Sequence, residues 1–410
     1  MFNRFGTVCG NVAFYFVLCF SSTCLGAAGE IYDLGTVGGP NSGGYGINAS
    51  GQIAGSAELG GHIHAVRYDG TPESGYVMRD LGDFAVGRGI NASGQVTGEM
   101  TVPVNVPHAF RYDGTPGSGG VMRDLGTFGG PESFYSHGSG INASGQVAGS
   151  ALTNDGFSYH AFRYDGTPGS GGVMRDLGTL GGDGSYAYGI NDAGQITGQA
   201  WTVAGVPHAF LYEGTPGSGG VMHDLGVLGT GTAINASGKI AGTMSVEGGL
   251  PGFPGYEDHA FRCDGTPGSG GVIHDLGKLS GTSSSRGAAI NSAGAVVGWC
   301  PHGFDFDTAT LWTPDLTMID LDAWFDAVNP TLGAQWELNQ AHGISDAGLI
   351  TGSGYYDDGP GGLSDGSRAF VLDASSLVPE PAGLVLLALL TPVTLCRNRR
   401  RRTVPSRSDI

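Results

Sequence analysis

Five histidines recur at equivalent places along the chain, each in a His-Ala-Phe triplet or a close variant of it. They are His64, His108, His160, His208 and His259. Imidazole is a common zinc ligand, but zinc requires its ligands within about 2.1 Å of one point. Equivalent positions on successive repeats point to separate places in space. We therefore expect one hydrogen-bonded structural histidine in each repeat, and the sequence predicts no metal ligand.

Two further motifs are similar in sequence to a phosphate-binding loop and to a glycosylation site, but we assign neither function to them. The glycine-rich segment Gly-Thr-Pro-Gly-Ser-Gly-Gly begins at Gly114, Gly166, Gly214 and Gly265. A phosphate-binding loop needs Gly-Lys-Ser/Thr at the start of a helix, and no lysine follows these segments. We interpret them as long, flexible rim loops. The glycosylation sequence Asn-Ala-Ser begins at Asn48, Asn91, Asn142 and Asn235. Turn formation by asparagine explains this motif better.

Acidic and aromatic residues gather in the last third of the chain. Asp357-Asp358-Gly359 and Ser364-Asp365-Gly366 lie close together, and Asp305 and Asp307 form a second pair. Calcium prefers such oxygen ligands, but the spacing of an EF-hand is absent. Four of the five tryptophans also lie here, namely Trp299, Trp312, Trp324 and Trp336. With Asp326 and Glu337 nearby they could form a sugar-stacking surface, but packing of a terminal insertion is the favoured interpretation.

Three short markers recur in the same order and divide the chain into seven units. The first is Gly-Ile-Asn or a near variant, the second is Asp-Leu-Gly, and the third is the His-Ala-Phe triplet. The first marker begins at Gly46, Gly89, Gly140, Gly189, Ala233, Ala289 and Gly343. A repeat of roughly 20–50 residues is the sequence signature of a solenoid or a propeller.

Each unit is predicted to form four short strands. In the second unit the first strand ends at 89–91, and the others cover 95–98, 108–112 and 121–125. The turn after the first strand, 91–94, ends in glycine, as it does in every unit. A type I turn closed by a left-handed residue requires this glycine, so we expect a positive φ at each. The structural turn glycines are Gly51, Gly94, Gly145, Gly194, Gly238, Gly294 and Gly348.

Four strands in about 50 residues, repeated seven times, predict an all-β fold, a seven-bladed β-propeller of four-stranded antiparallel blades. No stretch keeps a 3.6-residue period over a typical helix length. The strand at Ile31–Leu34 has no partner before it, and the strand at Arg368–Leu372 has none after it. Pairing of these first and last strands would close the ring and remove an exposed edge. The alternative, an open β-solenoid, would leave them unpaired at opposite ends.

Residues 1–28 have the features of a secretory signal peptide. Arg4 supplies the positive charge, residues 12–20 are apolar, and residues 25–28 suit cleavage after Ala28. The apolar run is nine residues long, whereas a membrane-spanning helix needs about 20. We therefore expect a secreted domain at 29–376 between this signal and a C-terminal segment at 377–410.

The C-terminal segment contains three parts in a fixed order. Pro379, Glu380 and Pro381 precede an uncharged run at 382–396, and arginines then gather at 397–402. The arginines would hold their end of the run on the cytoplasmic side of a membrane. This tail resembles the PEP-CTERM sorting signal of bacterial exosortase substrates. The resemblance implies export, retention by a short transmembrane helix, and cleavage near Pro379-Glu380-Pro381 by an exosortase-like enzyme. A plain tail anchor is the alternative.

The repeats also resemble those of the HAF-repeat family of extracellular bacterial proteins. The matching text includes 176–182, 188–198 and 208–212, and the resemblance covers residues 31 to about 373. It implies no general enzymatic activity. The last unit has a long insertion at 322–341, which is similar to the terminal unit of that family.

Composition limits the partners of the domain. The 410-residue chain has 78 glycines, 37 acidic and 19 basic residues, and a net charge of −18. Without 1–28, which hold one arginine, and 382–410, which hold six arginines and one aspartate, the net charge is −24. Such a domain lacks the basic patches that nucleic-acid binding needs. Its two cysteines, Cys263 and Cys300, form no disulfide framework, although one bridge between them is left open.

Together these features predict an exported, non-enzymatic propeller with a structural or binding role in the cell envelope or extracellular matrix. The sequence predicts no catalytic residue and no cofactor. The expected partners are the export machinery, an exosortase-like enzyme, the membrane before processing, and extracellular polysaccharide as a candidate ligand. Two alternatives stay open, a secreted polysaccharide hydrolase or lyase and a calcium- or glycan-dependent adhesin. Acidic residues of units five to seven that converge on one rim of a central funnel would favour the hydrolase.

Overall fold

The computed structural model describes residues 29–378, except 37, 104, 130–133, 251–252, 266–270, 303–306 and 358–365. The predicted signal peptide, the motif Pro379-Glu380-Pro381, the apolar run and the arginine cluster lie outside this part of the chain. Within the described part, no helix is both long and apolar enough to cross a membrane.

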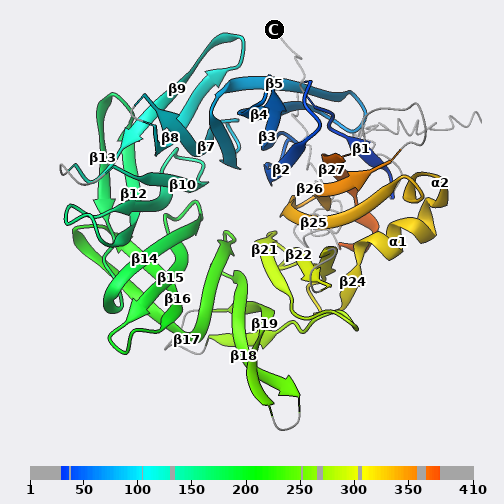
Figure 1. The fold of residues 1–410 in the computed structure, drawn as a ribbon. Coiled ribbons are helices and arrows are strands. Elements are labelled where there is room, and N and C mark those ends of the chain that lie inside the picture. Colours follow the sequence, from blue (N-terminus) through cyan, green and yellow to red (C-terminus); the bar gives the residue numbers. More distant parts are fainter. Residues whose placement is uncertain are drawn as a thin grey trace, which may run out of the picture.

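The described chain is almost entirely β, and its strands pair antiparallel in small sheets that follow one another around a common centre (Figure 1). The first three sheets contain β2 (Ser42–Ile47), β3 (Ile53–Leu59), β4 (His62–Thr71) and β5 (Gly75–Asp83), then β6 (Ala85–Ile90), β7 (Val96–Val102), β8 (Val106–Thr115) and β9 (Ser118–Gly126), and then β10 (Ser136–Ile141), β11 (Val147–Leu152), β12 (Tyr159–Thr167) and β13 (Ser170–Asp176). In each sheet the first strand lies nearest the centre.

The next sheet is continuous over seven strands, which are β14 (Gly181–Ile190), β15 (Ile196–Thr202), β16 (Pro207–Thr215), β17 (Ser218–Ile234), β18 (Ile240–Leu250), β19 (Phe253–Asp264) and β20 (Val272–Asp275). The first half of β17 pairs with β16, and its second half pairs with β18. One 17-residue strand therefore serves as the outer strand of one four-strand set and the inner strand of the next.

The last two sheets contain β21 (Arg286–Ile290), β22 (Val296–Pro301), β23 (Asp307–Trp312) and β24 (Met318–Asp320), and then β25 (Trp336–Ile344), β26 (Leu349–Tyr356), β27 (Gly366–Asp373) and β1 (Ile31–Asp33).

The first strand of the chain completes the last sheet. Strand β1 lies antiparallel to β27, with Ile31 opposite Leu372 and Asp33 opposite Phe370. The predicted pairing of the two end strands is confirmed, and the solenoid alternative, which leaves both unpaired, is wrong.

The hydrophobic core lies between neighbouring sheets. One cluster joins Ala148 and Ala161 of the β10–β13 sheet to Ile196 and Phe210 of the next sheet. Close approach near the centre requires glycine in the second strand of a sheet. A Cβ atom at Gly98 would lie 1.8 Å from the carbonyl oxygen of Val86 on the paired strand, so no larger residue fits there.

Two short helices occupy the insertion at 322–341, where none was predicted. They are α1 (Leu321–Val328) and α2 (Pro330–Gly333). The Asp320 carboxylate accepts the N–H of Ala323 at the start of α1, and Leu321 and Phe325 bury one face of the helix. A helix of eight residues is too short to establish a 3.6-residue period in the sequence.

The glycine-rich segments that begin at Gly114, Gly166 and Gly214 are tight hairpins, so their interpretation as long loops was wrong. Residues 266–270 of the fourth segment lie outside the described part of the chain. Strand β8 continues to Thr115 and β9 begins at Ser118, which leaves Pro116 and Gly117 as the turn. Gly117 has φ +72°, as the glycine of a Pro-Gly type II turn requires. The other glycines of the segment belong to the strands, and each is required for its own reason. Gly114 and Gly119 have positive φ values of +94° and +81°, whereas Gly120 has no space for a side chain. A Cβ at Gly120 would lie 2.0 Å from the hydroxyl oxygen of Tyr112.

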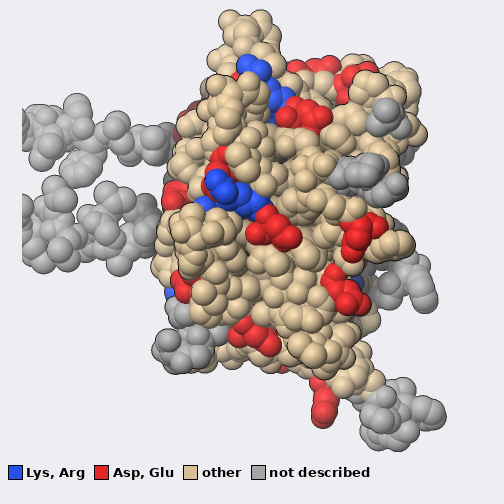
Figure 2. All heavy atoms as spheres, turned by 90° about the vertical axis from the view of Figure 1, so that its left-hand side faces the viewer, with Lys and Arg blue, Asp and Glu red and all other residues tan. Residues whose placement is uncertain are grey.

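On the face shown in Figure 2, acidic side chains are more widespread than basic ones. Figure 2 shows the side of the molecule where β12, β13 and β16 lie, with acidic side chains scattered and the basic ones beside them. Arginines of the outer strands account for part of this pattern, because Arg79 lies 3.6 Å from Asp69 and Arg175 lies 3.4 Å from Asp165.

Candidate functional site

The first marker holds the units together at their turns. In the first unit the Asn48 side-chain oxygen accepts the N–H groups of Ser50 and Gln52, and its amide nitrogen donates to the Asn91 carbonyl at 2.9 Å. The same step to the next unit starts from Asn91, Asn142, Asn191 and Asn235. Because these side chains are buried and their amide nitrogens are bonded, they act in turns, which agrees with the turn interpretation of Asn-Ala-Ser.

The seven turn glycines have φ between +74° and +91°, so the predicted positive φ is confirmed at every one. The carbonyls of Gly94, Gly145, Gly194 and Gly294 also accept a cross-unit bond from a buried arginine. Arg67 donates to the Gly94 carbonyl at 2.7 Å and Arg111 to that of Gly145 at 2.7 Å. The glycines therefore belong to the repeated contacts that hold neighbouring units together. We call these contacts the frame.

The five repeated histidines each pair with the aspartate of the second marker in the same sheet, as the structural interpretation predicts. The Nδ1–oxygen distances run from 2.9 to 3.1 Å in His64–Asp80, His108–Asp124, His160–Asp176, His208–Asp224 and His259–Asp275. In the third of these pairs, the hydrogen bond with Asp176 raises the pKa of His160. Within the described residues, no group of three or more His, Cys, Asp or Glu could hold a metal ion.

The last sheet reproduces this pair between the two ends of the chain. Arg368 stands in the place of the histidine, and its Nη1 lies 2.6 Å from Asp33, the aspartate of the first Asp-Leu-Gly. Ser42 adds a second repeated contact, since its hydroxyl donates to the Gly35 carbonyl at 2.7 Å and accepts the Ala369 N–H at 3.1 Å. The equivalent Ser136 makes the same two bonds, to Gly126 and Ala109, between internal sheets.

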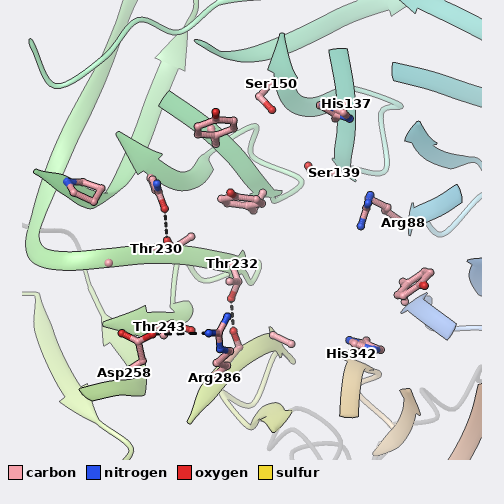
Figure 3. A pocket seen from close by; sticks show the side chains of 18 of the residues that line it. Arg88, His137, Ser139, Ser150, Thr230, Thr232, Thr243, Asp258, Arg286 and His342 are labelled. Carbon is pink, nitrogen blue, oxygen red and sulfur yellow. Dashed lines mark hydrogen bonds and ion pairs between the residues drawn. The ribbon is translucent and has the colours of Figure 1, made fainter. Parts of the chain in front are cut away.

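A cavity of about 980 Å³ lies at the centre of the ring of sheets, and we call it the central cavity. It is lined by the residue that precedes the first marker on each innermost strand. These residues are Tyr45, Arg88, Ser139, Tyr188, Thr232, Ala288 and His342. Figure 3 shows side chains entering this space from strands on all of its sides.

A second layer of the lining follows from strand alternation. Side chains two residues apart share one face of a strand, so His137, Tyr186, Thr230 and Arg286 accompany the residues just before the marker. Their partners on the next strand of each sheet also reach the cavity. These partners are Ser150, Gln199, Thr243 and Trp299.

One charged group in the wall is a three-residue cluster around Glu99. His137 Nδ1 lies 2.6 Å from Glu99 Oε2, and Arg88 Nη2 lies 2.6 Å from Glu99 Oε1. The bond from His137, together with Arg88, holds the pKa of Glu99 at about 2 despite its burial. Glu99 is thus ionised at neutral pH and cannot donate a proton as the acid of a glycosidase would. It orients Arg88 and His137 instead.

A second charged group lies on the β18, β19 and β21 strands. Asp258 accepts the Ser245 hydroxyl at 3.0 Å and lies 3.9 Å from Arg286 Nη2, the pair joined by a dashed line in Figure 3. Asp258 is the acidic lining residue that comes from units five to seven in the described chain. The convergence of several acids that would favour a hydrolase is not found there.

Three aromatic rings form one wall of the cavity. The His342 ring lies 5.3 Å from the Tyr45 ring and 5.5 Å from the Trp299 ring. Burial, with a smaller effect of Arg88, lowers the pKa of His342 to about 4, so the imidazole is neutral at neutral pH. It therefore acts as an aromatic surface with one donor and one acceptor nitrogen.

The late tryptophans divide between core and cavity. Trp312 and Trp336 are buried in the core and Trp324 packs beside it, so for these three the packing interpretation is correct. Trp299 instead lines the central cavity. Burial also raises the pKa of Asp322, to about 6. Its carboxylate accepts the Leu338 N–H at 2.7 Å within the insertion, so it has a structural contact there.

Other candidate residues have simpler positions. Of the proposed calcium ligands, Asp305, Asp358 and Asp365 lie outside the described residues, and the described Asp307 accepts the Gln340 side-chain amide. Cys263 and Cys300 are both buried and free, and burial raises the pKa of the Cys263 thiol to about 11. The bridge that the sequence left open is not formed.

The cavity residues were missed by the sequence analysis, although a signal was present. The three repeated markers form the contacts between units and not the cavity lining. The informative position is the one just before Gly-Ile-Asn, where the side chain changes in almost every unit while its neighbours stay the same. Reading that variation as a lining would have required knowing that this strand faces the centre.

No protein-family model matches the sequence, and no curated protein matches it. Among solved structures, a triple mutant of AofleA from Arthrobotrys oligospora is 13% identical with a TM-score of 0.36, over 69% of this chain and 85% of that one. Puromycin hydrolase is 12% identical with a TM-score of 0.49, over 84% of this chain and 53% of that one. The Aleuria aurantia lectin in complex with Fucα1-6GlcNAc is 12% identical with a TM-score of 0.37, over 67% of this chain and 91% of that one. These weak likenesses carry no functional conclusion.

Proposed function

We propose that the protein is an exported, non-enzymatic binding protein whose ligand occupies the central cavity. The observation that carries this proposal is the contrast between frame and lining. The turn glycines, the buried asparagines and the His–Asp pairs repeat from unit to unit. The seven positions before the first marker hold six different residue types and face one space.

Such variation suits a ligand without the symmetry of the ring. Identical units would present seven identical groups to the cavity, and that surface would hold an asymmetric ligand poorly. Ligand sites commonly combine apolar and aromatic walls with a few well-placed polar groups in a volume of about 300–1,000 Å³. The central cavity has this size and these residue types.

The full architecture belongs to the same proposal. We take the sheets to be the blades of a seven-bladed β-propeller in which β17 joins two blades and β1 closes the last. The strand pairing of β1 with β27 and the repeated contacts of Arg368 and Ser42 support it. Closure fixes the innermost strands around one axis, which a shared cavity requires.

Export and sorting rest on the resemblance of the tail to a PEP-CTERM signal. Full-length protein would be held in the membrane by its C-terminal helix, and the mature surface form would lack Arg399–Arg402. Mass spectrometry of protein recovered from the surface of producing bacterial cells tests this. Mature protein that still contains these arginines would contradict processing.

Blocking the cavity tests the binding role. Ala288 lines the cavity, and Ala288→Trp would place an indole ring in that space without removing a side-chain hydrogen bond of the frame. Val203 is 84% exposed and lies outside the lining, so Val203→Trp is the matched control. Co-sedimentation with the extracellular polysaccharide of the producing cells should be lost in Ala288→Trp and kept in the control. Equal binding by both variants would overturn the proposal.

A further inference from the structure

The central cavity has two kinds of wall in alternating positions around its axis. Because the sheets follow chain order around the centre (Figure 1), the order of the units gives the order of the walls. Trp299, His342 and Tyr45 form one aromatic wall, on β22, β25 and β2. Tyr186 and Tyr188 of β14 lie across the ring from it.

The second aromatic wall is supported from behind. Tyr186 stacks on Tyr159 at 5.5 Å with an angle of 24° between the ring planes, and it contacts Trp201 at 5.9 Å. Rings fixed by their neighbours lose little freedom when a ligand packs on them. This wall therefore offers a preformed apolar surface.

Polar groups fill the two gaps between the aromatic walls. Arg88 with Glu99 occupies the gap on the β6 and β7 side, and Arg286 with Asp258 occupies the gap on the β19 and β21 side. Thr230, Thr232 and Thr243 extend the second group, and Figure 3 shows them between Ser150 and Arg286. Each gap thus presents fixed donors and acceptors together.

The arginines and carboxylates of the cavity wall pair off. Arg88 has Glu99 beside it and Arg286 has Asp258, and the Glu99 oxygens are both bonded. The rest of the domain is strongly acidic and would repel a polyanion at low ionic strength. A wall whose arginines are each matched by a carboxylate, inside an acidic shell, suits an uncharged ligand with many hydroxyl groups.

We propose that the ligand of the central cavity is a neutral saccharide. This inference rests on the proposed binding function and names its ligand class. A pyranose ring has two weakly polar faces and an equator of hydroxyl groups that both donate and accept. The faces pack against the two aromatic walls, and the hydroxyls bond to the Arg–carboxylate pairs and threonines. Both walls contact the same sugar or successive sugars of one chain.

Isothermal titration calorimetry of the full chain in mild detergent tests the ligand class. The probes are neutral gluco-, manno- and galacto-oligosaccharides and the acidic oligogalacturonates and oligoalginates. We expect binding of a neutral oligosaccharide. Trp299→Ala and Tyr186→Ala should each weaken it by roughly tenfold, Trp299→Phe should restore most of it, and Ala288→Trp should abolish it. Phe157→Ala, at a residue 89% exposed and outside the lining, is the control.

The other outcomes separate the inference from the function on which it rests. Binding of acidic oligosaccharides alone, lost in Arg88→Gln, would overturn the neutral character of the proposed saccharide and keep the binding role. Absence of sugar binding, with matrix binding still blocked by Ala288→Trp, would do the same. Sugar binding that Ala288→Trp leaves unchanged would place the site elsewhere and contradict both.

Discussion

Residues of the repeats have one of two roles. They either hold neighbouring units together or line the central cavity. Gly94 and its equivalents hold a left-handed conformation at the turn, and the carbonyls of Gly94 and Gly145 accept hydrogen bonds from buried arginines. His342 stands one residue before the marker and faces the cavity. The two roles predict different consequences of substitution.

Gly94→Val should destabilise the domain by roughly 1–2 kcal/mol, because a β-branched residue pays a steric penalty at positive φ. A Cβ there would also lie 3.0 Å from Arg67 Nη1. Urea unfolding followed by circular dichroism measures the effect. Ala92→Val, at an exposed position of the same turn, is the control and should change little. Equal loss in both variants would contradict the conformational explanation.

His342 should make stability depend on pH in the mildly acidic range. Its pKa is about 4 in the folded protein and about 6.5 in the unfolded chain, so the unfolded state binds more protons between these values. Stability that is present above about pH 6.5 is therefore lost as the pH falls towards 4. The difference in unfolding free energy between wild type and His342→Gln should shrink from pH 7 to pH 4.5. A difference that stays constant or grows would contradict it.

Among the secondary-structure elements, the glycine-rich hairpins lead to a testable prediction, because they are not the long loops that the sequence suggested. Residues 166–171 are the ends of β12 and β13 with the turn between them. Their deletion removes paired residues and a turn, and it should lower the melting temperature clearly. Pro168→Ala keeps the backbone conformation of the turn and should cost much less. Two similar melting temperatures, by scanning calorimetry, would support the original interpretation of a loop.

The repeats were predictable because each strand carries a marker that its local structure requires. Gly94 marks a left-handed turn position, Asn91 caps the same turn, and Phe110 is fully buried between sheets. The strand ends were harder, since Gly114 and Gly119 are glycines inside a hairpin and look like a loop. The central cavity depends on seven side chains brought together from distant parts of the chain, and no local pattern contains that convergence.

At the scale of the whole molecule, the joint between the two ends differs from the internal joints in one respect. Its contacts match the internal ones, with Arg368–Asp33 in place of a His–Asp pair. The outer strands of other sheets are connected to their neighbours by hairpins, whereas no hairpin connects β1 to β27. In the proposed propeller, loss of β1 would therefore open the ring.

Deletion of residues 31–35 should expose the edge of β27 at Arg368–Leu372 and promote aggregation or partial unfolding. The effect should exceed that of deleting residues 166–171, because a hairpin turn affects one sheet and the end joint affects the ring. Light scattering and melting temperatures of the two deletion variants compare them directly. A smaller effect of the 31–35 deletion would contradict the importance of closure.

The proposed binding site places the ligand on the axis of the ring. The most direct test is a crystal structure of the protein with a neutral oligosaccharide identified by calorimetry. Density between Trp299 and Tyr45 on one side and Tyr186 and Tyr188 on the other, with hydroxyls near Arg88 or Arg286, is the predicted result. A saccharide bound between two sheets or on the outer face, with the central cavity holding only water, would contradict the account.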